Sequence, residues 1–237
     1  MNFDFQEFRA KELTRPRIKV LVGEFGSGKT ELAVTLASYM QRSGMKAAVV
    51  DMDLVKPYFR TREHRKRLEA EGVTVVAAQE KLAHADLPVM PSDLSRVLFC
   101  PEYHVVVDVG GANAAIVLGQ IRNRILENGC EVLMVVNICR PFSADADEVV
   151  STIGNIEAAS GMKVTGLISN TNIGAETTEQ QVLAGLQATR EVSAITGLLL
   201  RWLVLPVWLM GRIIVDEPML PLQPMTRYPW DDNENPV

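Results

Sequence analysis

A glycine-rich segment near the start of the chain has the residue types and spacing of a phosphate-binding loop. It matches the pattern G-x-x-x-x-G-K-[ST] without a gap, through Gly23, Glu24, Phe25, Gly26, Ser27, Gly28, Lys29 and Thr30. Glycines let successive backbone N–H groups turn toward phosphate oxygens, and a helix that follows adds the positive end of its dipole. We expect Lys29 to bind the β- and γ-phosphates of a nucleotide and Thr30 to coordinate Mg²⁺, with the adjacent Glu31 in the same binding segment. The alternative is a chance glycine-rich turn before a helix.

An acidic residue follows an apolar run in the middle of the chain. Three valines precede Asp108, and Asp108, Val109, Gly110 and Gly111 form a D-x-x-G pattern. We expect Asp108 to hold Mg²⁺, directly or through water, and the amide of Gly111 or Gly110 to sense the terminal phosphate. A solvated acid before a flexible turn is the alternative.

A second acidic strand end reads Val-Val-Asp51-Met52-Asp53. Ligands of open α/β sheets bind at the carboxyl edge of the strands, so these acids should lie near the phosphate loop. We predict that Asp53 coordinates Mg²⁺ and orients the attacking water, which makes Lys29 and Asp53 the candidate catalytic residues. Asp51 is a supporting acid or a simple solvated strand end.

The elements that must position these residues alternate along the chain. Short Val-, Ile- and Leu-rich runs predict strands at 19–22, 47–51, 73–78, 105–109, 132–137, 164–170 and 202–205. Amphipathic patterns predict helices at 29–42, 61–71, 92–99, 114–128, 144–160 and 178–196, with Ser143 at the start of the fifth. The alternation predicts a three-layer α/β/α fold with a mostly parallel central sheet of about seven strands. We expect one domain over 1–237, with a core at about 17–210 and a C-terminal extension at 211–237.

The order of these motifs resembles the SIMIBI class of P-loop NTPases, and in particular the CobQ/CobB/MinD/ParA group of nucleotide-binding proteins. The resemblance covers about residues 17–207 and implies a nucleotide-driven switch, often a nucleotide-sandwich homodimer. One position departs from the deviant loop of MinD and ParA, because Glu24 stands where that loop has a second lysine. An acid beside phosphates would repel them, so Glu24 should point outward. Lys56, Arg60 or Arg62 could supply a replacement cation, or they form part of a solvated basic helix face.

Two predicted strands end in asparagine, at Asn137 and Asn170. The guanine-reading pattern [NT]-K-x-D is absent, since its acidic position falls on Arg140 or Ile173. Resemblance to ATP-using relatives such as dethiobiotin synthetase implies that Asn170 contacts adenine. It also implies that the segment with Pro206 and Val207 packs over the ring. A turn or helix cap is the alternative role for Asn170.

The composition gives no strong signal for nucleic-acid or membrane binding. The 237 residues carry a formal net charge of −5. The longest apolar stretch, 198–210, is shorter than the roughly 20 residues that span a bilayer, so we expect a buried strand there. The three cysteines have no disulfide-like spacing, and the start of the chain lacks a secretory pattern, which favours a cytoplasmic location.

Together these features predict a Mg²⁺-dependent, ATP-binding switch that hydrolyses ATP to ADP. We expect a nucleotide-dependent homodimer and a protein partner that the sequence does not identify. An ATP-dependent small-molecule kinase or ligase of the dethiobiotin synthetase type is an alternative, and so is a non-hydrolysing regulatory module. A GTP-binding metallochaperone is a further alternative, because Cys100 and His104 lie close together in the sequence.

Overall fold

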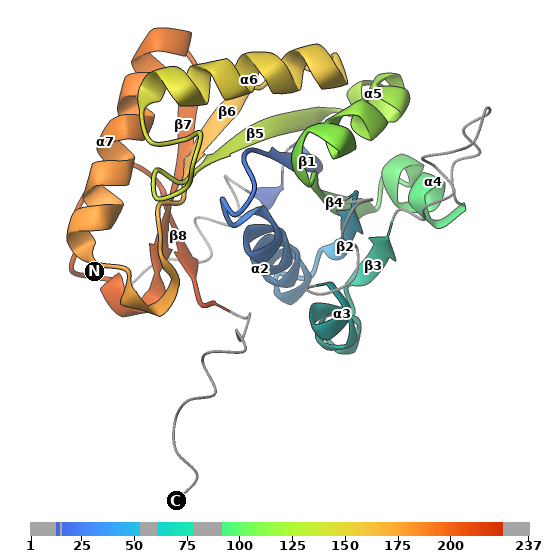
Figure 1. Ribbon diagram of the computed structural model, residues 1–237. Helices are drawn as coiled ribbons and strands as arrows, with labels where there is room; N and C mark the ends of the chain where they lie inside the picture. Colours follow the sequence, from blue (N-terminus) through green and yellow to red (C-terminus); the bar gives the residue numbers. More distant parts are fainter. Residues whose placement is uncertain (1–12, 15, 53–60, 78–91, 225–237) are drawn as a thin grey trace, which may run out of the picture.

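A computed structural model of the chain describes residues 13, 14, 16–52, 61–77 and 92–224 (Figure 1). Its centre is an eight-stranded sheet in the order β3-β2-β4-β1-β5-β6-β7-β8, in which every neighbouring pair is parallel. The strands are β1 (Ile18–Val22), β2 (Lys46–Asp51), β3 (Thr74–Ala77), β4 (Tyr103–Asp108), β5 (Cys130–Val136), β6 (Gly166–Ser169), β7 (Leu199–Pro206) and β8 (Met219–Leu222).

Helices cover both faces of this sheet, so the predicted three-layer α/β/α fold is confirmed. They are α2 (Lys29–Arg42), α3 (Thr61–Ala70), α4 (Ser92–Phe99), α5 (Gly111–Glu127), α6 (Ala146–Ser160) and α7 (Glu179–Thr196), with short 3₁₀ turns η3 (Gly174–Glu176) and η4 (Val207–Leu209). The side chains of successive residues in a strand point to opposite faces of the sheet and pack in two separate hydrophobic cores. Val20 and Val22 pack with α4, α5 and α6, whereas Leu21 packs with α2. Burial on both faces explains why most residues of the strands are apolar.

The seven strands and six helices that the sequence predicts are present, with ends that differ by up to a few residues. The eighth strand, β8, lies in the segment assigned to a C-terminal extension, where prolines argue against a strand. Pro221 is tolerated because β8 is an edge strand, paired on one side only with β7. The start of α6 also differs, since Asp145 and not Ser143 is the N-cap, and its side chain accepts a hydrogen bond from the Glu148 amide.

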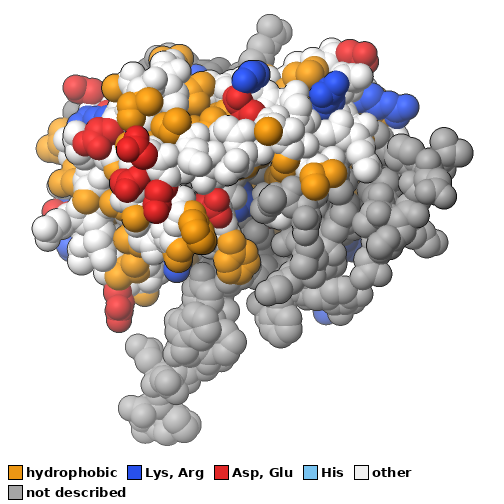
Figure 2. All heavy atoms as spheres, turned by 45° about the horizontal axis from the view of Figure 1, so that its top comes forward, with side chains coloured by type: hydrophobic (Ala, Val, Ile, Leu, Met, Phe, Trp, Pro, Cys, Tyr) orange, Lys and Arg blue, Asp and Glu red, His pale blue; other side chains and the backbone are white. Residues whose placement is uncertain are grey.

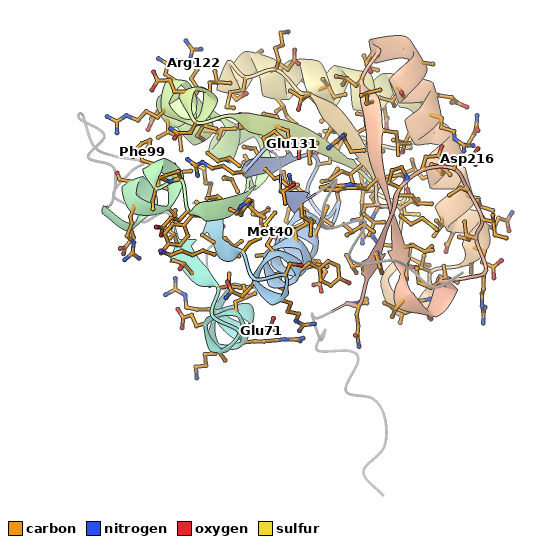
Figure 3. All side chains as sticks on the ribbon, turned by 180° about the vertical axis from the view of Figure 1, so that it is seen from behind. Met40, Glu71, Phe99, Arg122, Glu131 and Asp216 are labelled. Carbon is orange, nitrogen blue, oxygen red and sulfur yellow. The ribbon has the colours of Figure 1, made fainter. Side chains whose placement is uncertain are left out.

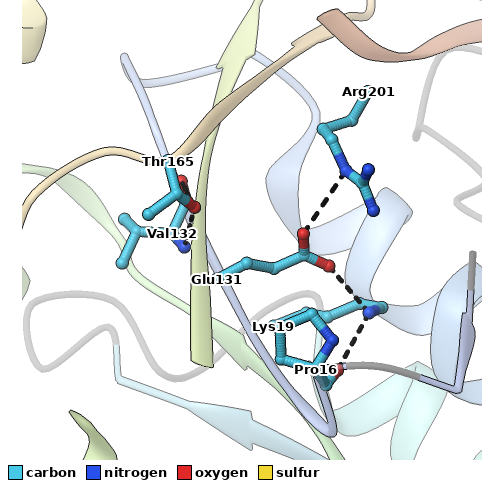
Figure 4. Close-up of polar contacts among 6 residues, drawn as sticks. All are labelled: Pro16, Lys19, Glu131, Val132, Thr165 and Arg201. Carbon is cyan, nitrogen blue, oxygen red and sulfur yellow. Dashed lines mark hydrogen bonds and ion pairs between the residues drawn. The ribbon is translucent and has the colours of Figure 1, made fainter. Parts of the chain in front are cut away.

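A buried ion cluster joins three strands at their amino-terminal ends, opposite the predicted site (Figure 4). Lys19 of β1 and Glu131 of β5 are register neighbours, and Nζ lies 2.7 Å from Oε1. Arg201 of β7 approaches the other carboxylate oxygen at 3.4 Å. Lys19 also donates to the Pro16 carbonyl at 3.0 Å. Figure 3 shows Glu131 among the central strands, where its carboxylate neutralises cations that the core would otherwise exclude.

The prediction of a buried strand within the apolar stretch 198–210 is confirmed for residues 202–206 of β7, whereas Leu199 and, in η4, Val207 and Trp208 are exposed. Across the part of the chain that the structure describes, no helix has the length and apolar character needed to cross a membrane.

Candidate functional site

The predicted site segments meet at the carboxyl edge of the sheet. The strand order places β1 between β4 and β5, so the loop after β1 lies between Asp108 at the end of β4 and the segment after β5. This is the edge at which open α/β sheets bind ligands. Residues 23–28 form the loop, and α2 begins directly after it, at Lys29.

The backbone of this loop takes conformations that glycine adopts readily. Gly23, Gly26 and Gly28 have φ angles of 144°, 78° and 92°. A Cβ atom on Gly23 would lie 2.6 Å from the Val135 carbonyl oxygen, so the loop also packs closely against β5. Alternating backbone conformations of this kind turn N–H groups toward one centre and form an anion-binding nest. The nest and the N-terminus of α2 together favour a phosphate.

The Lys29 side chain is buried and folded along the loop. Its ammonium group donates to the carbonyls of Gly23 at 2.9 Å and Glu24 at 2.7 Å, and the Ser27 hydroxyl lies 3.4 Å away. These hydrogen bonds compensate for the burial of the ammonium group next to the nest. Lys29 is therefore in place to meet phosphate oxygens.

Oxygen ligands suited to Mg²⁺ lie beside the lysine. The Thr30 hydroxyl donates to Oδ2 of Asp108 at 2.6 Å, and Asp51 is the register neighbour of Asp108 on β2. Both carboxylates are almost fully buried. Hydroxyl and carboxylate oxygens are the ligands that Mg²⁺ prefers, so the donor set fits this ion. Gly111 begins α5, three residues after Asp108. Asp53, the other predicted ligand and catalytic residue, falls outside the described residues.

Glu24 is held by α6. The Thr152 hydroxyl donates to Oε1 of Glu24 at 3.1 Å, and also to the Phe142 carbonyl at 3.4 Å. This carboxylate therefore lies against Thr152 at the α6 side of the loop. The next residue, Phe25, has 75% of its surface exposed. The candidate replacement cations Lys56, Arg60 and Arg62 lie where the structure describes no side chains.

Asn170 braces the phosphate loop. Its buried amide Nδ2 donates to the Ser27 carbonyl at 2.7 Å and lies against Gly28. The backbone carbonyl of Asn170 accepts a hydrogen bond from the side-chain Nδ2 of Asn172 at 2.8 Å. Asn137 joins the segments after β5 and β6, since its Nδ2 donates to the Asn172 carbonyl at 3.0 Å. The predicted adenine contact of Asn170 thus competes with a role in shaping the loop.

A second basic side chain binds the loop, and the sequence analysis assigned it no role there. Nε of Arg140 donates to the Gly26 carbonyl at 3.0 Å. The two residues are 114 positions apart. The sequence signal for this contact is the position of Arg140 shortly after the carboxyl end of β5, the strand next to β1.

A surface cavity of about 410 Å³ lies next to the segment that follows β7. It is lined by residues 175–180 and by Trp208, Leu209 and Arg212. Pro206 ends β7, and Val207 begins η4 directly before Trp208. Asn170, Pro206 and Val207 do not line this cavity themselves, although all three lie at the same edge of the sheet.

The Cys100 and His104 pair does not extend into a larger cluster. Among the residues that the structure describes, no group of three or more His, Cys, Asp or Glu side chains could hold a metal ion. His104 is half-buried on β4, and burial lowers its pKa, with smaller effects from the positive charges of Lys19 and Arg17.

Comparisons with known proteins agree with this architecture. The family model described as Zeta toxin matches residues 4–85, which include the phosphate loop. Among solved structures, FtsY from Thermotoga maritima is 19% identical, with a TM-score of 0.53, and the match covers 78% of this chain and 60% of that one. FtsY from Mycoplasma mycoides is 15% identical, with a TM-score of 0.50 and coverages of 83% and 66%.

The signal recognition particle 54 kDa protein from Aeropyrum pernix, solved in complex with GDP, is 21% identical. Its TM-score is 0.50, and the match covers 77% of this chain and 40% of that one. The chain thus spans less than two thirds of each of these three proteins. No curated protein sequence matches it. Sheet order, phosphate loop and neighbouring structures together give this chain the α/β fold of a P-loop NTPase.

Proposed function

We propose that this protein binds ATP with Mg²⁺ and hydrolyses it to ADP and inorganic phosphate. The observation that carries the proposal is the contact of Thr30 with Asp108 at 2.6 Å, directly beside the buried Lys29. A structural loop needs neither a buried lysine nor a buried carboxylate at this edge. Both are what a triphosphate and its metal ion require.

In this proposal, water attacks the γ-phosphorus and a new P–O bond forms. The bond to the β–γ bridging oxygen breaks, its electron pair leaves with ADP, and the proton of the water passes to the product phosphate. Lys29 and the loop amides stabilise the charge on the transferring group, and Asp53 orients the water. Mg²⁺, when bound by Thr30, Asp108 and Asp53, would neutralise charge on the phosphate oxygens.

Adenine is favoured over guanine because the acid that would bind guanine N1 and N2 is missing. The corresponding position holds Arg140 or Ile173, and neither side chain carries a carboxylate. Neither an arginine nor an isoleucine can accept those two hydrogen bonds, and an unpaired polar edge weakens binding strongly.

We further propose that the nucleotide state controls contact with a second copy or another protein. Gly111 is the candidate sensor of the terminal phosphate, since it begins α5 just after Asp108. Phe25 and Phe142 are 75% and 69% exposed, in segments that contact each other through Glu24 and Thr152. Figure 2 shows the α6 and α7 face, on which exposed apolar side chains lie among acidic ones. Under this proposal, these exposed apolar side chains take part in the contact.

Transfer of the phosphoryl group to a small molecule is the second candidate function. It is favoured by the Zeta toxin match, which spans the phosphate loop, β2 and β3. A kinase would use the same Lys29 and Mg²⁺ site but would release little phosphate without its second substrate.

Phosphate release by the purified chain, measured separately with ATP and GTP, tests the proposal. The mass in solution is measured with each nucleotide at the same time. The proposal predicts slow, Mg²⁺-dependent release with ATP and a larger particle in ATP than in ADP. Tight ATP binding without release would favour the phosphotransfer alternative, and preference for GTP would overturn the assignment of the base.

A further inference from the structure

Arg140 lies across the outside of the phosphate loop. Its Nε donates to the Gly26 carbonyl at 3.0 Å. An ideal Cβ on Gly26 would be 3.4 Å from Cδ of Arg140, so the aliphatic part of the arginine covers this glycine closely. A side chain that packs and hydrogen-bonds at one place is held in one conformation. Nε of Arg140 is therefore held at the Gly26 carbonyl, beside the proposed phosphate loop.

The turn that carries Arg140 is itself constrained. The Arg140 amide donates to the Asn137 carbonyl at 3.1 Å, and the Cys139 amide donates to Oδ1 of Asn137 at 3.0 Å. Pro141 restricts the next φ angle, and Phe142 has a φ of 63°. A non-glycine residue in the left-handed region costs about 1 kcal/mol or more and persists where the surroundings enforce it. The fold thus holds Arg140 against the loop at some cost in backbone strain.

Among the residues that the structure describes, the Arg140 guanidinium has no acidic partner. The terminal nitrogens of Arg140 make no hydrogen bond or ion pair with any residue in the described ranges. Lys29 is close along the loop, and the loop amides and the N-terminus of α2 add further positive potential. The one acid of the loop, Glu24, is bound by Thr152. Positive groups that converge in this way are stabilised by an anionic ligand.

We propose that Arg140 is a catalytic residue that contacts the β- and γ-phosphates of the nucleotide from within the same chain. The proposal rests on the proposed function. It assigns to Arg140 the positive charge that is missing from the loop, because Glu24 stands where the loop of MinD and ParA has a lysine. A guanidinium group anchored through Nε still presents its two terminal nitrogens, which can bind two phosphate oxygens together. As the γ-phosphoryl group transfers to water and the electron pair moves to the bridging oxygen, Arg140 stabilises the charge that develops there.

Single-turnover phosphate release from Mg·ATP, with the affinities for ADP and ATPγS, tests this role in the full chain. We expect Arg140→Ala to slow release at least about 100-fold at saturating ATP, as loss of one fixed charge donor at a transition state does. Its affinity for ATPγS should fall about tenfold and its affinity for ADP less than about threefold. Arg140→Lys keeps the positive charge but loses the two-point binding of the guanidinium group. Its release rate should therefore be about tenfold higher than that of Arg140→Ala.

A matched control is Arg190→Ala, which removes an arginine from an exposed ion pair with Glu217 and should leave all three quantities unchanged. Thermal unfolding of each variant checks that it folds.

If Arg140 only stabilised the shape of the loop, Arg140→Ala would lose ADP and ATPγS affinity equally, with no change in the rate per bound ATP. This result would overturn the proposal. Wild-type rates in Arg140→Ala overturn it as well. If the wild-type chain binds ATP without releasing phosphate, the ratio of ATPγS to ADP affinity decides the role of Arg140. Failure of the wild-type chain to bind any nucleotide overturns the proposed function itself.

Discussion

The Thr30 hydroxyl donates a 2.6 Å hydrogen bond to Oδ2 of Asp108, which joins the first turn of α2 to the end of β4. The two residues are 78 positions apart in the sequence. Their contact results from the strand order, because β4 is the direct neighbour of β1 and its carboxyl end lies beside the phosphate loop. A metal ion bound to both oxygens would be held between the loop and the sheet.

Asp108→Asn should remove most of the Mg²⁺ dependence of ATP binding. The amide has no charge with which to bind the ion, so the gain in ATP affinity on adding Mg²⁺ should fall at least about tenfold. Affinity in EDTA should stay close to wild type. Calorimetry with and without Mg²⁺ measures both values, with Asp93→Asn on the exposed face of α4 as control. An undiminished Mg²⁺ effect in Asp108→Asn would remove Asp108 from the metal site.

The sequence predicted the parts of this site that depend on local order. Loop, strand and helix follow one another between Ile18 and Arg42, and apolar runs identify the buried strands that end in Asp51 and Asp108. The Arg140 contact with Gly26 could not be predicted in this way, because it depends on the path of a turn after β5. The strand β8 was missed because proline lowers strand propensity, while an edge position removes much of that penalty.

Asn170→Ala should weaken ATP and tripolyphosphate binding by the same factor. The variant leaves the Ser27 carbonyl without its donor, and loss of one buried hydrogen bond of about 1 kcal/mol corresponds to about a fivefold change in affinity. Competition against a fluorescent nucleotide measures both ligands, with Asn155→Ala on the exposed side of α6 as control. A loss confined to ATP would instead support the adenine contact that the sequence analysis predicts.

Glu131→Ala should destabilise the fold without a specific effect on the phosphate site. It removes the carboxylate that pairs with the buried Lys19, and breaking a buried ion pair costs about 3–5 kcal/mol. Urea unfolding measures the change. The matched variant Glu102→Ala removes an exposed partner of Lys46 and should change the free energy of unfolding by less than about 1 kcal/mol. Equal effects of the two substitutions would contradict the role given to the buried cluster.

Acid should destabilise the protein in part through His104. Burial, with smaller contributions from Lys19 and Arg17, lowers the pKa of His104 below its ordinary 6.5. Between these two pKa values the unfolded chain binds more protons than the folded one, so the free energy of unfolding decreases as the pH falls through 6.5. In urea unfolding at about pH 7.5 and 5, His104→Gln should show a smaller decrease than wild type. The same decrease in both proteins would refute this contribution.

The central claim is that Lys29 and its loop form a site for Mg·ATP, and calorimetric titration of ATP into wild type and Lys29→Ala tests it most directly. We predict one site per chain in the wild-type protein and at least about a 100-fold loss of affinity in Lys29→Ala, because the buried ammonium group would meet two phosphates. Arg190→Ala should bind as wild type does. Equal ATP affinity in wild type and Lys29→Ala, in a folded variant, would contradict the account.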